Sequence, residues 1–352
     1  MEEKEQKLQE NVDKLNNKGF GIYFFTMDTK GNATASVANI YEIAKILIEN
    51  GYNAQILHEK NDYTSVETWL GEEYSSLPHC SIEKGELSVG PADFLVIPEL
   101  FGHVAEQTAQ LGCKKIILCQ SYDYMFEFLE PGKRWTDFGI TDCIAITDQI
   151  GEIVKKNFKT VNVDIIPLSI PEYFNKPTEP KKPIIAIHTR EQRDAAKTIK
   201  SFYLQFPQYK WITFRDLRGL SRKEFANVLK ECCCAIWIDD ISGFGTFPVE
   251  AMKCGTPVIG KVPNLIPEWL TEDNGMWTYE GHRLPEFAVN FIESWLEDSI
   301  PNEITKAMEP IESKYKREDQ VTKVLEVFEK YVKGRKEGME NHIKELAHNE
   351  VQ

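Results

Sequence analysis

Short apolar segments alternate with longer amphipathic segments along most of the chain. The first apolar segment, 21–26, is aromatic and β-branched, and after a loop at 27–32 apolar residues recur at helical spacing from Val37 to Ile48. This order predicts a strand, a loop and a helix. Because the apolar runs do not alternate with polar residues, they indicate a parallel sheet covered on both faces. Further strands of the first half are predicted at 53–57, 94–97, 115–119, 143–146 and 163–166.

The region from Pro167 to Pro183 contains five prolines. Proline continues neither a β-ladder nor a helix interior, so a connection between two domains is predicted there. The strand and helix alternation then resumes, and Ser221 with Glu224 forms a capping box that predicts a helix N-terminus. Strands of the second half are predicted at 184–187, 211–214, 233–238 and 256–259.

A chain of 352 residues exceeds the size at which one hydrophobic core keeps growing, so two domains are expected. After Gly334 the apolar positions become sparse, which predicts a solvated helix or a frayed end. The predicted division is a polar N-terminal leader (1–18), a first Rossmann-like domain (19–172), a proline-rich linker (173–183), a second Rossmann-like domain (184–315) and a charged C-terminal helix (316–352).

Composition narrows the range of partners and of cellular compartments. The net charge of −14 disfavours nucleic acid, because phosphate backbones are usually bound by clustered Lys and Arg. The eight cysteines include no C-x-x-C pair, which is typical of reduced thiols in a cytoplasmic protein. No secretion signal is expected, and the sequence contains no apolar run long enough to predict a membrane span.

The stretch from Ser242 to Gly260 is the most informative for chemistry. A strand ends at Asp239–Asp240, glycines let the backbone turn closely, and Pro248 is expected to open a helix whose free N–H groups face the loop. Such a helix start is an anion site made of backbone. Glu250, expected in the first turn, could accept hydrogen bonds from a ribose diol.

This stretch resembles the donor-binding signature of the GT4-like retaining glycosyltransferases, which have the GT-B fold. In that signature a Glu precedes Gly-Phe-Gly, and a second Glu eight positions after the first precedes Ala-Met-x-x-Gly-Thr-Pro-Val. Weaker matches at 165–170, 267–268 and 274–275 keep the register over most of 20–290. The matching residues are Gly243, Phe244, Gly245, Pro248, Glu250, Ala251, Met252, Gly255, Thr256, Pro257 and Val258.

The chain departs from the family pattern at two functional positions. Ser242 stands where the family has its first Glu, whose carboxylate holds donor-sugar hydroxyls, so a neutral hydroxyl replaces a charged acceptor. The family's Arg-x4-Lys becomes His188-x4-Arg193, with Arg190 and Lys197 nearby. The resemblance implies that these cations offset the charge on the leaving diphosphate without a metal ion. The loop before Pro267 and the stretch 211–225 also differ from the family.

Candidate acceptor-side residues lie in loops that follow strands of the first domain. Gly31 and Asn32 follow the first strand, and Gln120, Tyr122 and Asp123 follow another. His103 is a further candidate for a hydrogen bond to the acceptor, although a lone loop histidine is more often simply exposed. Aromatic residues between 122 and 138 could stack on sugar rings, but half or more are expected in the core.

No metal site is predicted, because Asp239 and Asp240 are adjacent and do not form converging ligands for Mg²⁺. No cofactor is expected beyond a nucleotide-diphosphate sugar as co-substrate. The resemblance implies donor binding by Gly243, Phe244, Gly245, Thr246, Glu250, Arg190, Arg193 and Lys197, with Glu250, Ser242, Arg193 and His103 as the catalytic candidates.

The sequence therefore predicts a metal-independent, retaining glycosyltransferase that transfers a hexose-type group from a nucleotide-diphosphate sugar to a hydroxyl. The acceptor stays open among glycan, lipid-linked sugar, protein and modified base. Two alternatives remain. The first is a catalytically silent nucleotide-sugar-binding or interaction protein of the same fold, suggested by Ser242, and the second is a nucleotide-sugar 2-epimerase.

Overall fold

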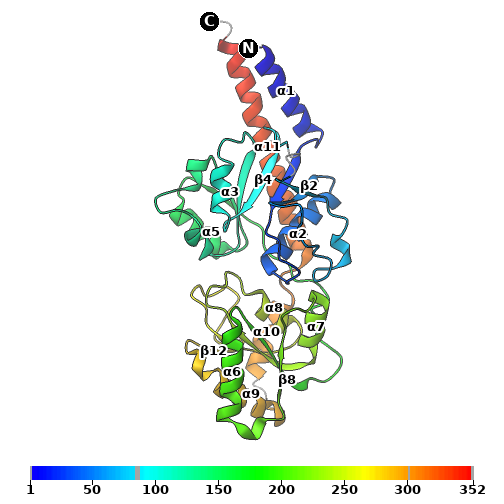
Figure 1. Cartoon of the computed structure of the whole chain (residues 1–352), viewed down its shortest axis with the longest axis vertical. Coiled ribbons are helices and arrows are strands. Elements are labelled where there is room, and N and C mark those ends of the chain that lie inside the picture. Colours follow the sequence, from blue (N-terminus) through cyan, green and yellow to red (C-terminus); the bar gives the residue numbers. More distant parts are fainter. Residues whose placement is uncertain (1, 84–87, 300–301, 350–352) are drawn as a thin grey trace.

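The computed structural model describes residues 2–83, 88–299 and 302–349, and shows two α/β domains placed end to end (Figure 1). Met1 and residues 350–352, which belong to the predicted leader and C-terminal helix, lie outside the described residues. The first and second domains are each built on one parallel sheet. The predicted α/β class with two Rossmann-like sheets and a C-terminal helix is confirmed.

The first sheet has, in the described part of the chain, seven parallel strands in the order β3-β2-β1-β4-β5-β6-β7. Both of its faces are buried by helices, which explains why its strands are apolar without alternation. The strands are β1 (Gly21–Phe25), β2 (Asn53–His58), β3 (His79–Ser81), β4 (Phe94–Pro98), β5 (Lys114–Cys119), β6 (Asp142–Ala145) and β7 (Asn162–Ile165).

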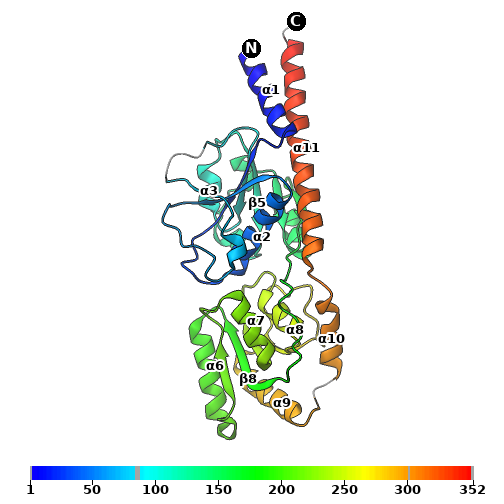
Figure 2. The same ribbon diagram turned by 90° about the vertical axis from the view of Figure 1, so that its right-hand side faces the viewer.

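Helices cover the two faces of the first sheet. Apolar residues of α2 (Ala35–Glu49) and α11 (Arg317–Asn349) share one core with the sheet, as Figure 2 shows for α11 along the side of the domain. The opposite face is covered by α3 (Gly102–Gln107), α4 (Tyr124–Glu127), α5 (Asp148–Asn157) and the short helix η2 (Trp135–Phe138). A further single turn, η1 (Glu72–Tyr74), lies between β2 and β3.

The second sheet has five parallel strands among the described residues, in the order β12-β11-β10-β8-β9. In the second sheet β8 is followed toward one edge by a single strand, β9, whereas in the first sheet the corresponding strand β1 is followed toward that edge by β2 and β3. The chain passes from β9 directly to α7. The strands are β8 (Lys182–Thr189), β9 (Thr213–Asp216), β10 (Cys232–Ile238), β11 (Val258–Lys261) and β12 (Met276–Thr278).

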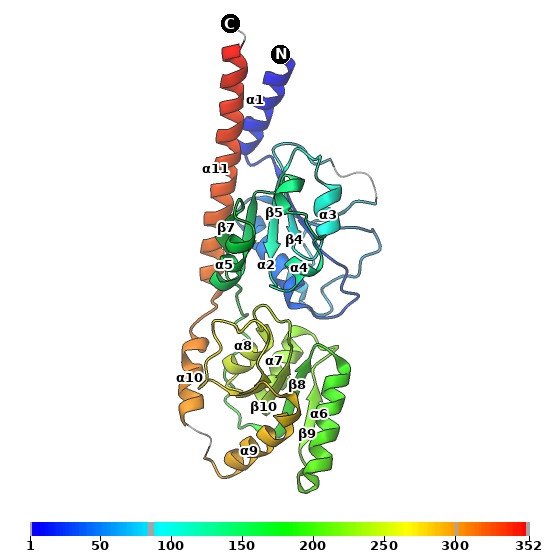
Figure 3. The ribbon, with the colours of Figure 1, turned by 90° about the vertical axis from the view of Figure 1, so that its left-hand side faces the viewer.

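The second sheet is also covered on both faces (Figure 3). Ser221 caps α7 by accepting from the N–H of Glu224, and Glu224 accepts from the N–H of Ser221, so the predicted capping box is confirmed. The helices are α6 (Gln192–Gln205) and α9 (Leu284–Leu296) on one face and α7 (Arg222–Glu231) and α8 (Thr246–Lys253) on the other, with the single turns η3 (Pro207–Tyr209) and η4 (Gly281–Arg283).

Two segments cross between the domains. The first follows β7, and the second joins α10 (Asn302–Glu312) to α11; the N–H of Ile170 donates to the carbonyl of Tyr315 at 2.9 Å, which ties the crossings together. The predicted linker 173–183 overlaps β8, which already begins at Lys182. No helix in the described part of the chain is long and apolar enough to cross a membrane.

The charged ends of the chain form a pair of helices. The predicted polar leader folds as α1 (Glu2–Asn16), which lies along the distal part of α11 (Figure 1). Val12 and Leu15 of α1 and Met339 of α11 are buried. The segment after Gly334 thus continues as helix to Asn349 and does not fray, because α1 covers its few apolar residues.

Candidate functional site

The carboxyl ends of both sheets point toward the space between the domains. In open α/β sheets, ligands bind outside these ends, where the strand order reverses. The order reverses between β1 and β4 in the first sheet and between β8 and β10 in the second. Every segment predicted to carry site residues follows one of the strands β1, β4, β5, β8 and β10, so the fold gathers these loops around one interdomain space.

The glycine loop after β10 leads directly into α8. Gly245 has a φ of 73° and stands at the N-cap, so the helix begins at Thr246. Pro248 therefore does not open the helix as predicted, and Glu250 lies in its second turn, because the left-handed glycine turns the chain two residues earlier. A Cβ at Gly245 would meet the Trp269 ring at 3.0 Å. The carbonyl of Phe244 accepts a hydrogen bond from the same indole at 2.6 Å, which fixes the loop.

Gly243 is the point where the two domains approach most tightly in this loop. A Cβ on Gly243 would lie 2.4 Å from the carbonyl oxygen of Gln120 and 3.0 Å from Cα of Ser121. Both neighbours are backbone atoms of the loop after β5, so neither can rotate away. A side chain at 243 would therefore force the domains apart, and Ser242 lies next to this contact.

Glu250 is buried and forms an ion pair with Arg222, the first residue of α7. Arg222 donates to Oε1 of Glu250, and the carboxyl group also lines a small cavity. Burial raises the pKa of Glu250 to about 7, and the Arg222 charge opposes that rise. The sequence analysis did not find Arg222. Arg222 lies three residues before Phe225, the first apolar residue of α7, and this position gives no signal of the pairing, because the ion pair joins residues on two helices.

Arg222 also holds α7 to the first domain. Its backbone N–H donates to the carbonyl of Trp69 at 2.8 Å, and its guanidinium lies over the Phe174 ring at 5.6 Å. The small cavity has a volume of about 100 Å³ and is bordered by the Arg222–Glu250 pair. The rings that line it belong to Trp69, Phe174, His188, Phe225 and Phe247. A flat aromatic group and a diol are the two chemistries that such a lining accommodates.

His188 does not supply the positive charge that its place in the family's Arg-x4-Lys pattern requires. The ring stacks on Phe247 with 5.0 Å between centroids, and burial lowers the pKa of His188, so the imidazole is neutral at pH 7. This position therefore carries no positive charge, because the His188 ring is enclosed by the rings of Phe225 and Phe247.

The predicted phosphate-side cations lie at the end of β8 and the start of α6. Arg190 is engaged by both carboxylate oxygens of Asp239, at 2.7 and 3.0 Å, and donates to the Tyr124 hydroxyl of the first domain at 2.8 Å. Arg193 and Lys197 are exposed on α6. Asp240 pairs with Lys261, so the adjacent aspartates have different partners and do not converge on one point. Within the described residues, no cluster of His, Cys, Asp and Glu has the arrangement of a metal site.

Acceptor-side candidates after β1 and β4 are less well placed. Gly31 has a φ of 78° in a turn where Asn32 is exposed, and the cavity walls are formed by the following residues, 33–35. His103 is exposed on α3 and meets the edge of the Phe101 ring. Neither cavity is lined by Gly31, Asn32 or His103 in the described structure.

The loop after β5 carries three candidates. Gln120 is buried, accepts from the Asn39 amide at 2.9 Å and contacts Gly243 through its carbonyl. Tyr122 packs edge-on against Phe126, and burial raises the pKa of Asp123. Of the six aromatic residues in this region, only Trp135 and Phe138 are buried in the core, Phe126 and Phe128 are exposed, and the two tyrosines are half-buried. The prediction that half or more of these rings lie in the core is therefore wrong.

Glu99, at the end of β4, is a buried acid to which the sequence analysis gave no role. Its Oε1 accepts the N–H of Ser121 at 2.7 Å, while Oε2 has no partner within the described residues. Burial raises the pKa of Glu99 to about 7. The carboxyl thus supports the Gln120–Ser121 backbone against which Gly243 packs.

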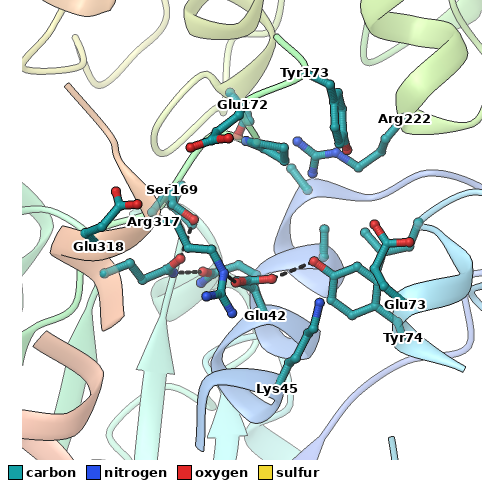
Figure 4. A pocket seen from close by; sticks show the side chains of 18 residues that line it. Glu42, Lys45, Glu73, Tyr74, Ser169, Glu172, Tyr173, Arg222, Arg317 and Glu318 are labelled. Atoms are coloured by element: carbon teal, nitrogen blue, oxygen red, sulfur yellow. Dashed lines mark hydrogen bonds and ion pairs between the residues drawn. The ribbon is translucent and has the colours of Figure 1, made fainter. Parts of the chain in front are cut away.

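A larger cavity of about 530 Å³ adjoins the small one through Arg222, Thr246 and Ala35 (Figure 4). It is lined by α2, the segment around η1, and both crossing segments. The large cavity lies mainly against the first domain, whereas the small one is bounded by α7 and α8 of the second. The interdomain space thus offers two adjoining compartments of different chemistry.

Solved structures share this architecture. Sucrose-phosphate synthase from Thermosynechococcus elongatus superposes with a TM-score of 0.62 at 14% identity, covering 90% of this chain and 100% of that one. Anabaena HepE in complex with UDP and glucose gives a TM-score of 0.62 at 12% identity, covering 88% and 100%. The fold is therefore that of the GT-B glycosyltransferases.

Among curated proteins, the chain is similar to an α-1,6-glucosyltransferase of Actinobacillus pleuropneumoniae serotype 7 (strain AP76). The two are 29% identical over 305 residues, which cover 82% of this chain and 89% of that protein. No known family model matches the sequence. Similarity over most of both chains, together with the fold, supports a glycosyltransferase enzyme.

Proposed function

We propose that this protein transfers a sugar from a nucleotide-diphosphate donor to a hydroxyl of an acceptor, as the GT4-like family does, with retention and without a metal ion. The observation that carries the proposal is Glu250, a buried carboxylate held by Arg222 at the edge of an aromatic cavity. A carboxylate beside an aromatic cavity suits a ribose diol and its base. HepE, which shares the fold, is bound to UDP and glucose.

The diphosphate would lie at the start of α8, between the loop 243–246 and the exposed cations Arg193 and Lys197 of α6. Backbone N–H groups and the positive end of the helix dipole stabilise negative charge there. Charge that develops on the leaving diphosphate is thereby offset without a metal. Ser242 would contribute a neutral hydroxyl to the donor sugar.

Transfer would depend on positioning more than on acid–base chemistry. The contact of Gly243 with the Gln120 carbonyl and the Arg190–Tyr124 hydrogen bond hold the two domains together around the gap. Such closure excludes water and aligns the acceptor hydroxyl with the anomeric carbon. Because the similar protein from Actinobacillus pleuropneumoniae is an α-1,6-glucosyltransferase, glucose is the first donor sugar to examine.

A thermal-shift screen against UDP, GDP, ADP, CMP and their sugar conjugates, with EDTA present, tests the donor site. A ligand that binds the native state raises its stability by mass action, so one nucleotide should stabilise the wild type and fail with Glu250→Ala. Glu303→Ala, an exposed acid of α10, serves as the control. If no nucleotide stabilises the wild type at millimolar concentration, the donor site is not functional, and an interaction protein of the same fold becomes the better account.

Product analysis separates transfer from the third possibility. A transferase gives a product whose mass is that of the acceptor plus one sugar. A 2-epimerase would leave the donor mass unchanged and need no acceptor. Turnover that proceeds without acceptor and conserves donor mass would refute the proposed reaction while keeping the donor site.

A further inference from the structure

The large cavity is lined mainly by the first domain and by the two crossing segments. Among the described residues that line it, Arg222 and Thr246 come from the second domain, and the others come from the first domain or from the two crossings. Its volume of about 530 Å³ falls within the range of small-molecule sites, roughly 300–1,000 Å³. The cavity is therefore large enough for a ligand of its own beside the donor.

A chain of hydrogen-bonded amides, which begins at a half-buried hydroxyl, forms the floor of this cavity and continues beyond it. Ser169 of the first crossing donates to Gln320 of α11, which donates to Asn39 of α2 at 2.8 Å. Asn39 in turn donates to Gln120 at 2.9 Å, in the loop that contacts Gly243. The floor is thus fixed before a ligand enters, and it connects the cavity to the place where the domains meet.

Each cation that lines the cavity already faces a carboxylate. Arg222 pairs with Glu250, and Arg317 pairs with Glu42 at 2.6 Å and with Glu49 at 2.7 Å. Lys45 lies 4.0 Å from Glu49 and 4.8 Å from the centre of the Tyr74 ring. These pairs leave little positive charge to attract a phosphate or a carboxylate.

Carboxylates remain in excess. Glu42 accepts from the Tyr74 hydroxyl as well as from Arg317, and Figure 4 shows both side chains turned toward it. Glu73, Glu172 and Glu318 line the cavity at positions exposed to solvent. Glu73 also lies 3.9 Å from Lys223, whereas no ion pair is formed by Glu172 or Glu318 within the described residues. An anion that entered would be repelled by the charges of Glu172 and Glu318, whereas sugar hydroxyls could donate to them.

We infer that the large cavity binds the acceptor as an uncharged, hydroxyl-rich saccharide, and that its carboxylates exclude acceptors carrying phosphate or carboxylate on the sugar that enters. This inference rests on the proposed function, because it assigns the substrate of the same reaction. Charge-assisted hydrogen bonds from hydroxyls to carboxylates fix orientation as well as affinity. The position beside Thr246 places such a sugar next to the start of α8.

A nucleoside is also uncharged and rich in hydroxyls, so the experiment must separate it from a saccharide. The aromatic rings of the small cavity favour the base there, which leaves the large one for the acceptor. Saturating UDP, or whichever nucleotide stabilises the protein, should therefore leave saccharide binding in place. Displacement by the nucleotide would assign the large cavity to the donor and overturn the inference.

Saturation-transfer NMR on the full chain tests the inference with glucose, galactose, N-acetylglucosamine, isomaltotriose and glucose 6-phosphate. We expect at least one neutral saccharide to bind at millimolar concentration and glucose 6-phosphate to bind at least about tenfold more weakly than glucose. The double variant Glu172→Lys/Glu318→Lys should narrow or reverse that difference. Glu303→Lys, which changes charge on the distant helix α10, should leave it unchanged.

Two results would overturn the inference. One is a wild type that binds glucose 6-phosphate as tightly as glucose, and the other is the absence of binding by every neutral saccharide. The nucleotide thermal shift is read separately on the same samples. If the protein binds a saccharide but no nucleotide raises its melting temperature, only the proposed donor site is refuted. If a nucleotide raises the melting temperature but no saccharide binds, only the acceptor assignment is refuted.

Discussion

The two domains share one architecture but build their cavities differently. In the second domain, the glycine loop and Glu250 follow one another within nine residues of chain, 242–250. In the first domain, the cavity takes Asn39 from α2, Tyr74 from η1 and Gln320 from α11. A site built from contiguous residues can be recognised as a sequence motif, whereas a cavity assembled from distant residues leaves no sequence pattern.

The polar contacts at the two cavities also differ. The second domain relies on one buried ion pair, Arg222–Glu250, beside aromatic rings, and the first relies on a chain of neutral amides with paired charges around it. A buried ion pair is sensitive to loss of one partner, because the other is left charged in a poorly solvated place. We therefore expect the single substitutions that lower the free energy of unfolding most to lie in the second domain.

Arg222→Gln gives the strongest test of this difference. Loss of one partner of a buried pair costs about 3–5 kcal/mol, so the free energy of unfolding at pH 8 should fall by about 3 kcal/mol. Because Arg222 lowers the pKa of Glu250, its loss raises that pKa above about 7. An acid whose folded pKa exceeds the unfolded value loses stability as pH rises, so the defect should be smaller at pH 6. Urea unfolding at both pH values measures it.

Arg222→Lys is the matched control, since it keeps the charge and removes the planar guanidinium. It should retain most of the stability and most of the nucleotide affinity. A defect in Arg222→Gln of equal size at pH 6 and pH 8 would show that the guanidinium matters for packing on Phe174 and not for the ionisation of Glu250.

Gly243→Ala tests the contact between the domains. The added Cβ would lie 2.4 Å from the Gln120 carbonyl, so closure is blocked while each domain stays intact. A displacement of about 1 Å can cost about 100-fold in rate, and we expect a fall in kcat of that order. Nucleotide affinity should fall less than kcat, because residue 243 contributes only its backbone to the loop that would hold the diphosphate. Gly334→Ala, in an open part of α11, is the control. An unchanged kcat would mean that this close approach has no part in turnover.

The fold could be predicted well because buried parallel strands produce apolar runs that a sequence displays directly. β3, which is three residues long and only partly buried, gave no such signal, and α1 hides Val12 and Leu15 among charged residues. The glycines of 243–245 marked the loop after β10 in the sequence. The partner of Glu250 was not found, because Arg222 reaches it from another helix.

The ionisation of two residues near the site depends on their surroundings in the fold. His188 falls where a cation is expected, and only its enclosure by Phe225 and Phe247 makes it neutral. Glu99, which no sequence pattern singled out, is buried beneath the loop after β5. Protonation states depend on burial, which a single sequence does not specify.

The histidine pair of the first domain predicts a smaller effect with a defined pH dependence. His58 is buried, lies 2.9 Å from His79 and stacks on Tyr63 with 3.9 Å between centroids. Burial and the neighbouring His79 lower the pKa of His58 from 6.5 to about 4. The unfolded chain then binds more protons, so stability is full above pH 6.5 and should fall by about 2 kcal/mol at pH 5.

Urea unfolding of His58→Asn at pH 8 and pH 5 measures this contribution, and His103→Asn, at an exposed position, is the control. The His58 variant should lose part of the difference between the two pH values, and the His103 variant should keep it. An equal pH dependence in both variants would assign the acid sensitivity to other groups.

Tyr124→Phe gives the smallest expected effect and tests whether the domains are joined by side chains as well as by the close approach at Gly243. The Tyr124 hydroxyl accepts from Arg190 at 2.8 Å, a contact between the domains, while Asp239 keeps Arg190 in place after the change. A hydrogen bond of this kind contributes about 0.5–1.5 kcal/mol, so turnover should fall by up to about tenfold without loss of stability. Tyr279→Phe, at an exposed position, removes a hydroxyl that makes no hydrogen bond within the described residues and should have no effect. If the two variants have equal kinetics, the Arg190–Tyr124 hydrogen bond does not help to hold the domains together. The backbone contact at the glycine loop would then be the main contact between the domains.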